Sequence, residues 1–103
     1  MEHIMENINK DQYYIVRCDR AGVFAGHIVK RYGREVEMTD VRRLWYWDGA
    51  ASLSQLAVEG VKYPKNCKVT VTVPSIILLD AIEILACSDA AEASIRGVPV
   101  WKI

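Results

Sequence analysis

The sequence has few of the residues that build metal centres, disulfide scaffolds and catalytic triads. Only three cysteines and two histidines occur among 103 residues. Cys18, Cys67 and Cys87 lie too far apart for a CxxC metal or redox motif. No Ser-His-Asp or Cys-His set has a spacing that would bring a nucleophile and its base together. We therefore expect no metal, no cofactor and no enzymatic activity.

Long apolar runs are also missing. No segment approaches the ~20 apolar residues of a membrane-spanning helix. The first ten residues contain neither the apolar core nor the small-residue cleavage site of a secretory signal. An odd number of cysteines without such a signal is typical of reduced thiols in the cytosol. We expect a cytoplasmic protein that does not enter a membrane.

The chain has no excess charge of either sign. Thirteen Lys and Arg balance thirteen Asp and Glu, so no overall field draws the protein to nucleic acid or to a membrane. The middle of the chain, 17–68, is nevertheless basic and its flanks are acidic. A basic centre of this size suits one small anionic ligand or an acidic patch on a partner, and is too weak for extended DNA binding. A solvated charged face without any ligand is the alternative.

Hydrophobic residues are abundant. They make up 51% of the sequence, which excludes a disordered protein. A chain of 103 residues is typical of one domain. Valine, isoleucine and threonine outnumber leucine and methionine, which favours strands over helices. We expect a flexible N-terminal arm over residues 1–11 and a single globular domain over residues 12–103.

Alternating hydrophobic residues, separated by turn residues, predict about six strands. These are expected at 13–18, 23–31, 34–38, 41–47, 69–73 and 81–86. Turns are predicted at 32–33 and at Thr39-Asp40. After Pro74, residues 76–79 are expected to form a bend or an edge piece. Residues 98–101 are extended and can pack back as a closing strand.

Two short helices complete the predicted fold. One covers residues 50–59 with Ser52 as its N-cap, and the other begins after Ser88 and ends near Gly97. The fold class is therefore α+β, mainly β: a small curved antiparallel sheet or partly open barrel with helices at its ends. Because so small a domain buries a modest core, and Trp, Tyr and Val occur on both strand faces, we expect a homo-oligomer.

The densest aromatic and cationic segment covers residues 42–47, with the sequence RRLWYW. On a strand, Arg43 and Trp45 share one face, and Arg42 and Tyr46 share the other. Each face then offers a guanidinium beside an aromatic ring, the pair of groups that holds a phosphate and stacks on a base. Tryptophans on one strand face are more typical of a core than of a ligand site, and the sequence does not decide which face is buried.

Two neighbouring segments add candidate groups. Phe24 lies between two glycines in residues 21–26 and offers a ring for stacking, although a bulged strand against a helix explains the same glycines. The start of the first predicted helix offers backbone N–H groups to an anion. The candidate ligand-binding residues are therefore Phe24, Arg42, Arg43, Trp45, Tyr46, Ala50, Ala51 and Ser52.

Three segments resemble a family of small proteins encoded by phages and prophages. They are RRLWYWDGAASLSQLA at 42–57, AGVFAG at 21–26 and GVPVWK at 97–102, and the likeness covers about residues 12–102. The family is described only as a domain of unknown function, so it brings no catalytic residue to this chain.

Small phage proteins of this size often counter host immunity, and some are strand-rich oligomers that sequester nucleotide second messengers. The resemblance implies a non-enzymatic counter-defence protein that binds a small anionic nucleotide-like immune signal in the host cytoplasm. Arg42 and Arg43 would then hold phosphate, and Trp45, Tyr46 or Phe24 would stack on a base. The alternatives are an inhibitor or adaptor that binds a host or phage enzyme through the same cluster, and a structural accessory of the phage particle.

Overall fold

A computed structural model describes residues 8–103 of the chain. Most of the expected N-terminal arm, residues 1–7, lies outside the described residues. The remainder, residues 8–11, turns back onto the sheet. The backbone N–H of Asn9 donates to the Tyr14 hydroxyl at 3.1 Å, and Ile8 packs against buried side chains of the strands.

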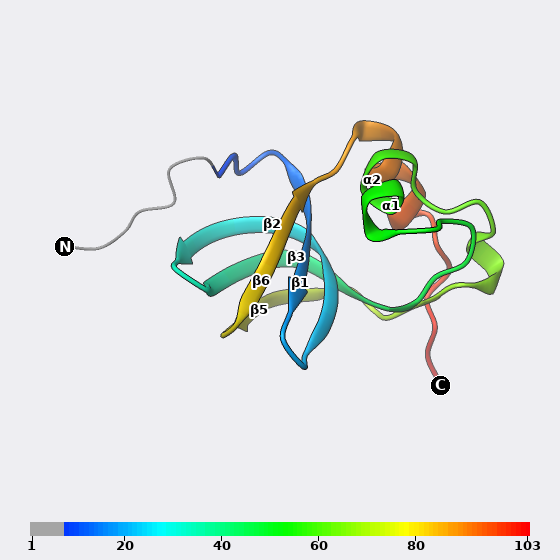
Figure 1. Cartoon of the computed structure of the whole chain (residues 1–103). Coiled ribbons are helices and arrows are strands. Elements are labelled where there is room, and N and C mark those ends of the chain that lie inside the picture. Colours follow the sequence, from blue (N-terminus) through cyan, green and yellow to red (C-terminus); the bar gives the residue numbers. More distant parts are fainter. Residues whose placement is uncertain (1–7) are drawn as a thin grey trace.

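The described residues contain six strands, two α-helices and one short 3₁₀ helix (Figure 1). In chain order they are β1 (Tyr13–Cys18), β2 (Gly22–Tyr32), β3 (Glu35–Tyr46), α1 (Leu53–Glu59), η1 (Pro64–Asn66), β4 (Lys68–Val69), β5 (Val73–Leu78), β6 (Ala81–Ala86) and α2 (Asp89–Arg96). The predicted mainly-β fold with two short helices is confirmed. None of the described helices is long and apolar enough to cross a membrane.

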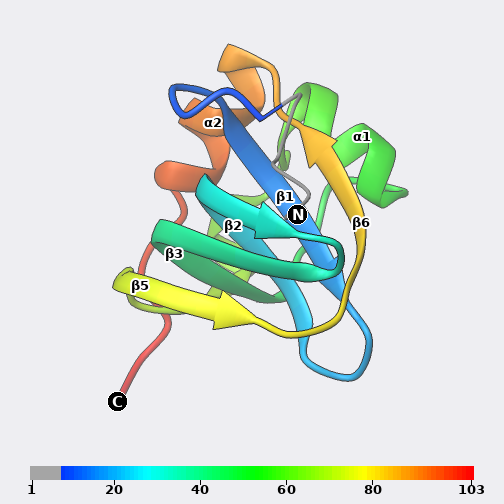
Figure 2. The same ribbon diagram turned by 90° about the vertical axis from the view of Figure 1, so that its left-hand side faces the viewer.

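The sheet is antiparallel and strongly curled. Its strand order is β5-β3-β2-β1-β6, with β4 beside the second half of β3. β5 and β6 lie at opposite rims of the sheet, yet only Leu79 and Asp80 join them. The sheet therefore curls until its rims approach each other without pairing (Figure 2). At this corner, the backbone N–H of Asp19 donates to the carbonyl of Asp80 at 3.0 Å.

The prediction of a turn at Thr39-Asp40 is wrong, because these residues form a β-bulge inside one long strand. At Gly26 the β2–β3 register shifts, so that β3 holds one more residue than β2. Asp40 takes a left-handed conformation with φ 54°. A Cβ on Gly26 would lie 2.9 Å from the carbonyl oxygens of both Thr39 and Asp40. Glycine thus allows the close approach, and the bulge bends β3 so that its two halves pair with different strands.

The strand expected at 69–73 also differs in extent. β4 ends at Val69, and the next strand, β5, begins at Val73 and runs through Pro74. Proline is tolerated there because β5 is a rim strand and needs no second ladder of hydrogen bonds. Of the two alternatives expected at 76–79, the edge piece is confirmed and the bend is wrong, because residues 76–78 belong to the rim strand β5, which pairs regularly with β3. The closing strand at 98–101 is reduced to one parallel bridge with β4.

Both faces of the central sheet are buried. Tyr13 and Ile15 of β1 lie on the face that α1 and α2 cover. Tyr14 and Val16 lie on the opposite face, inside the curl of the sheet, together with Met38 of β3. A strand buried on both faces carries a continuous apolar run rather than an alternating one, as residues 13–16 do. Each fully buried side chain of this size contributes about 1.5–3 kcal/mol to the free energy of folding.

We predict that Gly26→Ala lowers the free energy of unfolding by about 1–3 kcal/mol, because the added methyl group overlaps the β3 backbone at the bulge. Urea denaturation measures this change. Gly33→Asn is the matched control: a Cβ there meets nothing within 4 Å at φ +57°, and asparagine tolerates that conformation. The control should lose less than about 0.5 kcal/mol. Equal losses at the two positions would contradict the close approach at Gly26.

Candidate functional site

The neighbouring side chains of Arg42 and Arg43 point to opposite faces of β3, as the strand alternation predicts. Arg42 is buried, with 5% of its surface exposed. Its guanidinium donates to the backbone carbonyls of Thr70 and Ile95, each at 2.9 Å, and of Val69 at 3.3 Å. Burial lowers the pKa of this guanidinium. Arg42 thus connects β3 to the end of α2 and to the segment after β4, and its donors serve the fold.

Arg43 is exposed and lies over the ring of Phe24, its cross-strand neighbour on β2. The guanidinium carbon is 4.8 Å from the ring centroid. Two of the predicted ligand-binding residues are therefore in contact. Arg43 forms no ion pair with any acidic residue among residues 8–103.

A pocket of about 250 Å³ opens beside Arg43. It is lined by Phe24, Val41, Arg43, Thr70, Val71, Val73 and Ile76. The Thr70 hydroxyl already accepts from the Arg43 backbone N–H at 3.0 Å and donates to the Val71 carbonyl at 3.2 Å. The walls are thus mainly apolar, and the guanidinium is the only charged group among the lining residues.

Two residues after Arg43 on β3, Trp45 stacks on Trp101 from the C-terminal segment. The ring centroids are 6.3 Å apart and the planes differ by 14°. Trp45 is 64% and Trp101 46% exposed, so Trp45 is not a core residue. Lys68 places its ammonium 5.4 Å from the Trp101 ring centroid. The Trp101 backbone N–H holds the segment in place by donating to the Val69 carbonyl at 2.9 Å.

Tyr46 joins this group because of a second bulge. The β3–β4 register shifts between Leu44 and Tyr46, which places Tyr46 opposite Lys68, and cross-strand partners share a sheet face. The predicted alternation therefore fails at Tyr46, which is 51% exposed. We refer to Arg43, Trp45, Tyr46, Lys68 and Trp101 as the cationic-aromatic face.

The predicted N–H groups at the first helix start are not part of this face. α1 begins at Leu53, and Ser52 caps it by accepting from the Gln55 backbone N–H at 3.1 Å. The Gln55 side chain in turn accepts from the Ala51 N–H at 2.7 Å. Ala50 packs against the core beneath the helices. None of Ala50, Ala51 and Ser52 lines the pocket beside Arg43.

Sequence reasoning missed Lys68 and Trp101. Neither residue is near 42–47 in the chain: the pairing of β4 with β3 brings Lys68 there, and the folding of the C-terminal segment along β4 brings Trp101. The one available signal was the tryptophan in the GVPVWK segment at 97–102, which carries no partner information by itself.

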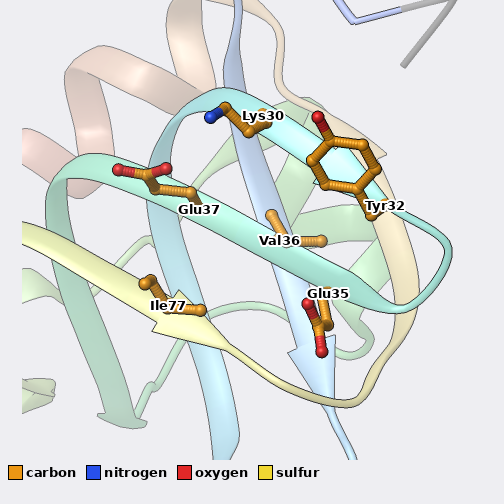
Figure 3. A pocket seen from close by; sticks show the side chains of 6 residues that line it. All are labelled: Lys30, Tyr32, Glu35, Val36, Glu37 and Ile77. Atoms are coloured by element: carbon orange, nitrogen blue, oxygen red, sulfur yellow. The ribbon is translucent and has the colours of Figure 1, made fainter. Parts of the chain in front are cut away.

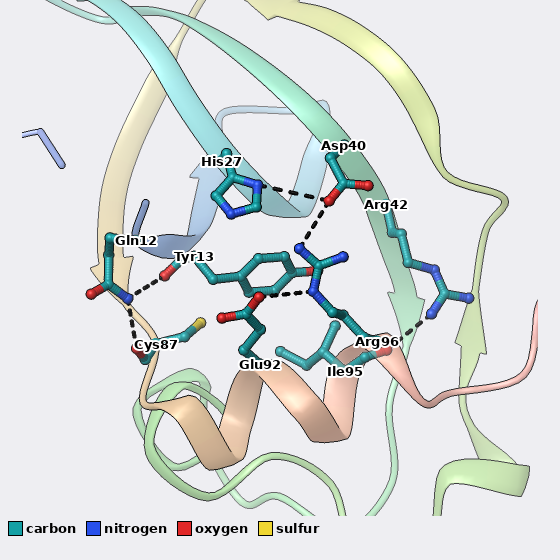
Figure 4. A network of polar contacts seen from close by, with 9 residues as sticks. All are labelled: Gln12, Tyr13, His27, Asp40, Arg42, Cys87, Glu92, Ile95 and Arg96. Carbon is teal, nitrogen blue, oxygen red and sulfur yellow. Dashed lines mark hydrogen bonds and ion pairs between the residues drawn. The ribbon is translucent and has the colours of Figure 1, made fainter. Parts of the chain in front are cut away.

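A polar cluster on the helix side of the sheet was also not predicted (Figure 4). Asp40, at the β3 bulge, lies 2.9 Å from Arg96 of α2 and 3.7 Å from His27 of β2. Arg96 also pairs with Glu92 at 2.8 Å, and its guanidinium lies 4.8 Å above the Tyr13 ring. The charges in this cluster thus have partners within the chain, and they attach α2 to the bulge.

Burial in this region raises the pKa values of two acidic groups. It raises the pKa of the Tyr13 phenol to about 12, with Arg96 acting weakly in the opposite direction. It raises the pKa of the Cys87 thiol to about 11, and the charge of Glu92 adds to the effect. Both groups therefore keep their protons at neutral pH. Among residues 8–103, no three His, Cys, Asp or Glu side chains gather to hold a metal ion.

A separate pocket of about 210 Å³ lies near the β2–β3 turn, over the end of β2, the beginning of β3 and the end of β5 (Figure 3). It is lined by Lys30, Tyr32, Glu35, Val36, Glu37 and Ile77. One cation and two carboxylates face it, so its charge does not favour an anion.

Fold and site together define a small, mainly-β protein with a cationic-aromatic surface. The model of the family described as domain of unknown function DUF6948 matches residues 11–95. The chain therefore belongs to this family. No curated protein and no solved structure was found to match it. The family match includes Arg43, Trp45 and Lys68, whereas Trp101 lies beyond its end.

We predict that the adjacent arginines differ in their effect on stability. Arg42→Ala should lower the free energy of unfolding by roughly 2–4 kcal/mol, because it removes a buried side chain and its three hydrogen bonds to backbone carbonyls. Arg43→Ala removes only an exposed cation–π contact and should cost less than about 1 kcal/mol. Urea denaturation of the two variants provides the comparison. If Arg43→Ala were the more destabilising change, the assignment of their roles would be wrong.

The pKa values of Tyr13 and Cys87 predict a loss of stability in alkali. In the unfolded chain these groups ionise near their ordinary values of 10.0 and 9.0, before they ionise in the fold. The free energy of unfolding is therefore unaffected below about pH 9 and falls as the pH rises towards 12. The Tyr13 contribution is about 2–3 kcal/mol. Denaturation across this range should show a smaller fall in Tyr13→Phe, and identical profiles would refute the argument.

Proposed function

We propose that this chain is a non-enzymatic binding module for a small anionic, nucleotide-like ligand, and that the cationic-aromatic face is its binding site. One observation carries the proposal. Arg43 and Lys68 have no acidic partner among residues 8–103, and they flank a stack of two exposed tryptophans. Exposed aromatic rings beside unpaired cations are the groups that bind single nucleotides.

The ligand would use two kinds of contact. A base would stack on the side of Trp45 that Trp101 does not cover, a contact worth about 1–3 kcal/mol. A phosphate would accept charge-assisted hydrogen bonds from Arg43 and Lys68. Phe24 supports Arg43 from beneath, and this limits the motion that the arginine would lose on binding.

The chemistry of the face favours binding over catalysis. Its five residues include no carboxylate, imidazole or thiol, and histidine is the side chain that most often transfers protons in catalysis. The Thr70 hydroxyl beside the face accepts one backbone hydrogen bond and donates another. A ligand held there would be bound without being converted.

A module that binds without turnover removes its ligand by stoichiometric capture. Together with the likeness to phage-encoded proteins, this property leads us to propose a counter-defence role in the host cytoplasm, in which the protein sequesters a nucleotide immune signal. Capture is effective when the binding sites outnumber the signal molecules and when the Kd is below the concentration at which the signal acts.

A second candidate function is binding of a host or phage enzyme as an inhibitor or adaptor. The observation that favours it is the combination of Arg43 with exposed Trp45, Tyr46 and Trp101. Tryptophan, tyrosine and arginine dominate the energetic centres of protein interfaces. The apolar pocket beside Arg43 would receive an apolar side chain of such a partner.

We predict that one class within a panel of cyclic and linear nucleotides raises the thermal unfolding temperature of the protein. A ligand at 100 times its Kd that binds only the fold adds about 2.7 kcal/mol of stability. Arg43→Ala should weaken this binding by about 1.5–3 kcal/mol, and Trp45→Ala by a similar amount. Titration calorimetry measures both losses.

Matched controls come from exposed residues outside the face. Lys65→Ala removes a cation from η1, and Tyr63→Ala removes an exposed ring next to it. Neither should change nucleotide binding. Unchanged binding in folded Arg43→Ala and Trp45→Ala variants would refute the site. A flat response to every nucleotide, with a stoichiometric protein partner recovered from host lysate, would favour the second candidate.

A further inference from the structure

The rim strand β6 has a free edge. It pairs with β1 on one side, and no other strand of the described chain pairs with its second side (Figure 2). A groove of about 280 Å³ runs along this edge, between residues 81–84 and Arg31 of β2. The Ala81 backbone N–H at the start of this edge donates to the Arg34 carbonyl at 2.9 Å, so the edge is open to another strand beyond Ala81.

The ladder with β1 determines which backbone groups of β6 face this edge. The Cys87 N–H donates to the Tyr13 carbonyl at 2.9 Å. Hydrogen-bonded positions alternate along an antiparallel ladder, so Leu85 directs its N–H and carbonyl towards β1. Ile84 and Ala86 direct theirs outwards. Unpaired donors and acceptors in a row are a template for strand addition.

β6 is also the less protected rim of the sheet. The other rim, β5, contains Pro74, which blocks pairing at its first residues. β6 contains no proline and no lysine, and its single charge, Glu83, is paired with Arg17 at 2.8 Å. Its register with β1 is irregular only near Ile82, whose side chain is 46% exposed. Sheet edges without protecting residues are surfaces for association.

We propose that β6 pairs with β6 of a second copy of this chain, antiparallel, about a two-fold axis at Ile84. Ile84 would then lie opposite Ile84 of the second copy, Glu83 opposite Leu85, and Ile82 opposite Ala86. An axis at Ala86 would instead bring Ile84 opposite Ser88, the N-cap of α2, where the strand has ended. The sheets of the two copies become one continuous sheet.

The inner face of this pairing is self-complementary, as a two-fold interface requires. The half-buried Ile84 side chains of the two copies meet there and cover each other. On the other face, the two Glu83 carboxylates are diagonal neighbours across the axis, and each keeps Arg17 of its own copy as its partner. The Arg17–Glu83 pairs thus meet as two neutral units, and the apolar contact and the backbone hydrogen bonds, rather than charge, stabilise the pairing.

The dimer surface is separate from the cationic-aromatic face. β1 and β2 lie between β6 and β3 in the sheet order, and none of the five face residues belongs to β6. The inference therefore goes beyond the proposed function and does not depend on it. Loss of dimerisation with unchanged nucleotide binding would separate the two experimentally.

The first test is the mass of the full chain in solution, measured by light scattering over a range of concentrations. We expect twice the 11.7 kDa mass of one chain. Ile82→Lys places a charge at the interface and should give the single-chain mass. Ile77→Lys, at a 62% exposed position on the opposite rim, is the matched control and should remain a dimer. A wild-type chain that is monomeric throughout, or an Ile82→Lys variant that is still a dimer, would overturn the proposal.

The second test determines the register. Residues opposite each other at a hydrogen-bonded position have Cα atoms about 5.5 Å apart, which suits a disulfide. Ile84→Cys should therefore link two chains on mild oxidation, and Leu85→Cys should not. The three native cysteines are buried, so wild-type protein should give no linked dimer. Linkage through Leu85→Cys but not Ile84→Cys would refute the register, and thermal unfolding confirms that each variant is folded.

Discussion

The buried guanidinium of Arg42 is the interaction on which the arrangement of this small molecule depends. It donates to three carbonyls from two segments of the chain: those of Val69 and Thr70, at and just after the end of β4, and that of Ile95 in the last turn of α2. A domain of 103 residues has little apolar core to spare for fixing such peripheral segments. One rigid, planar cation with several donors joins both segments to β3.

The inward direction of Arg42 follows from the bulge at Asp40. Met38 and Val41 both face the interior of the curled sheet, although three positions separate them. In a regular strand, residues an odd number apart point to opposite faces, so the extra residue at the bulge reverses the alternation. Arg42 then faces the helices and Arg43 faces the apolar pocket. The same bulge directs Asp40 to Arg96 of α2. One inserted residue thus decides which arginine is structural and which is exposed.

Local sequence patterns predict those strands whose bounds are fixed by apolar residues and by the turn residues on either side. The predicted bounds of the strands at 13–18 and 81–86 are confirmed, because mainly apolar runs between turn residues are a strong signal. Asp40 was read as a turn residue, since aspartate tolerates left-handed backbone, and the bulge uses that tolerance within a strand. The sequence predicts that Pro74 interrupts a strand before a bend or an edge piece, whereas the proline lies inside the rim strand β5 itself. Trp101 joined the site only through tertiary packing, which no periodicity reports.

The exposed position of the two stacked tryptophans makes the fold less stable than it would be if the rings were buried. Trp45 and Trp101 leave 64% and 46% of their surfaces in water, although burial of an aromatic side chain is among the largest sources of folding free energy. The bulge at Trp45 and the anchoring of Trp101 to Val69 hold both rings at the surface rather than in the core. A ligand or partner that covered the two tryptophan rings would bury their remaining apolar surface, beside two cations that have no acidic partner among residues 8–103. If the proposed function holds, stability and binding are divided between the two faces of β3, with Arg42 serving the first and Arg43 the second.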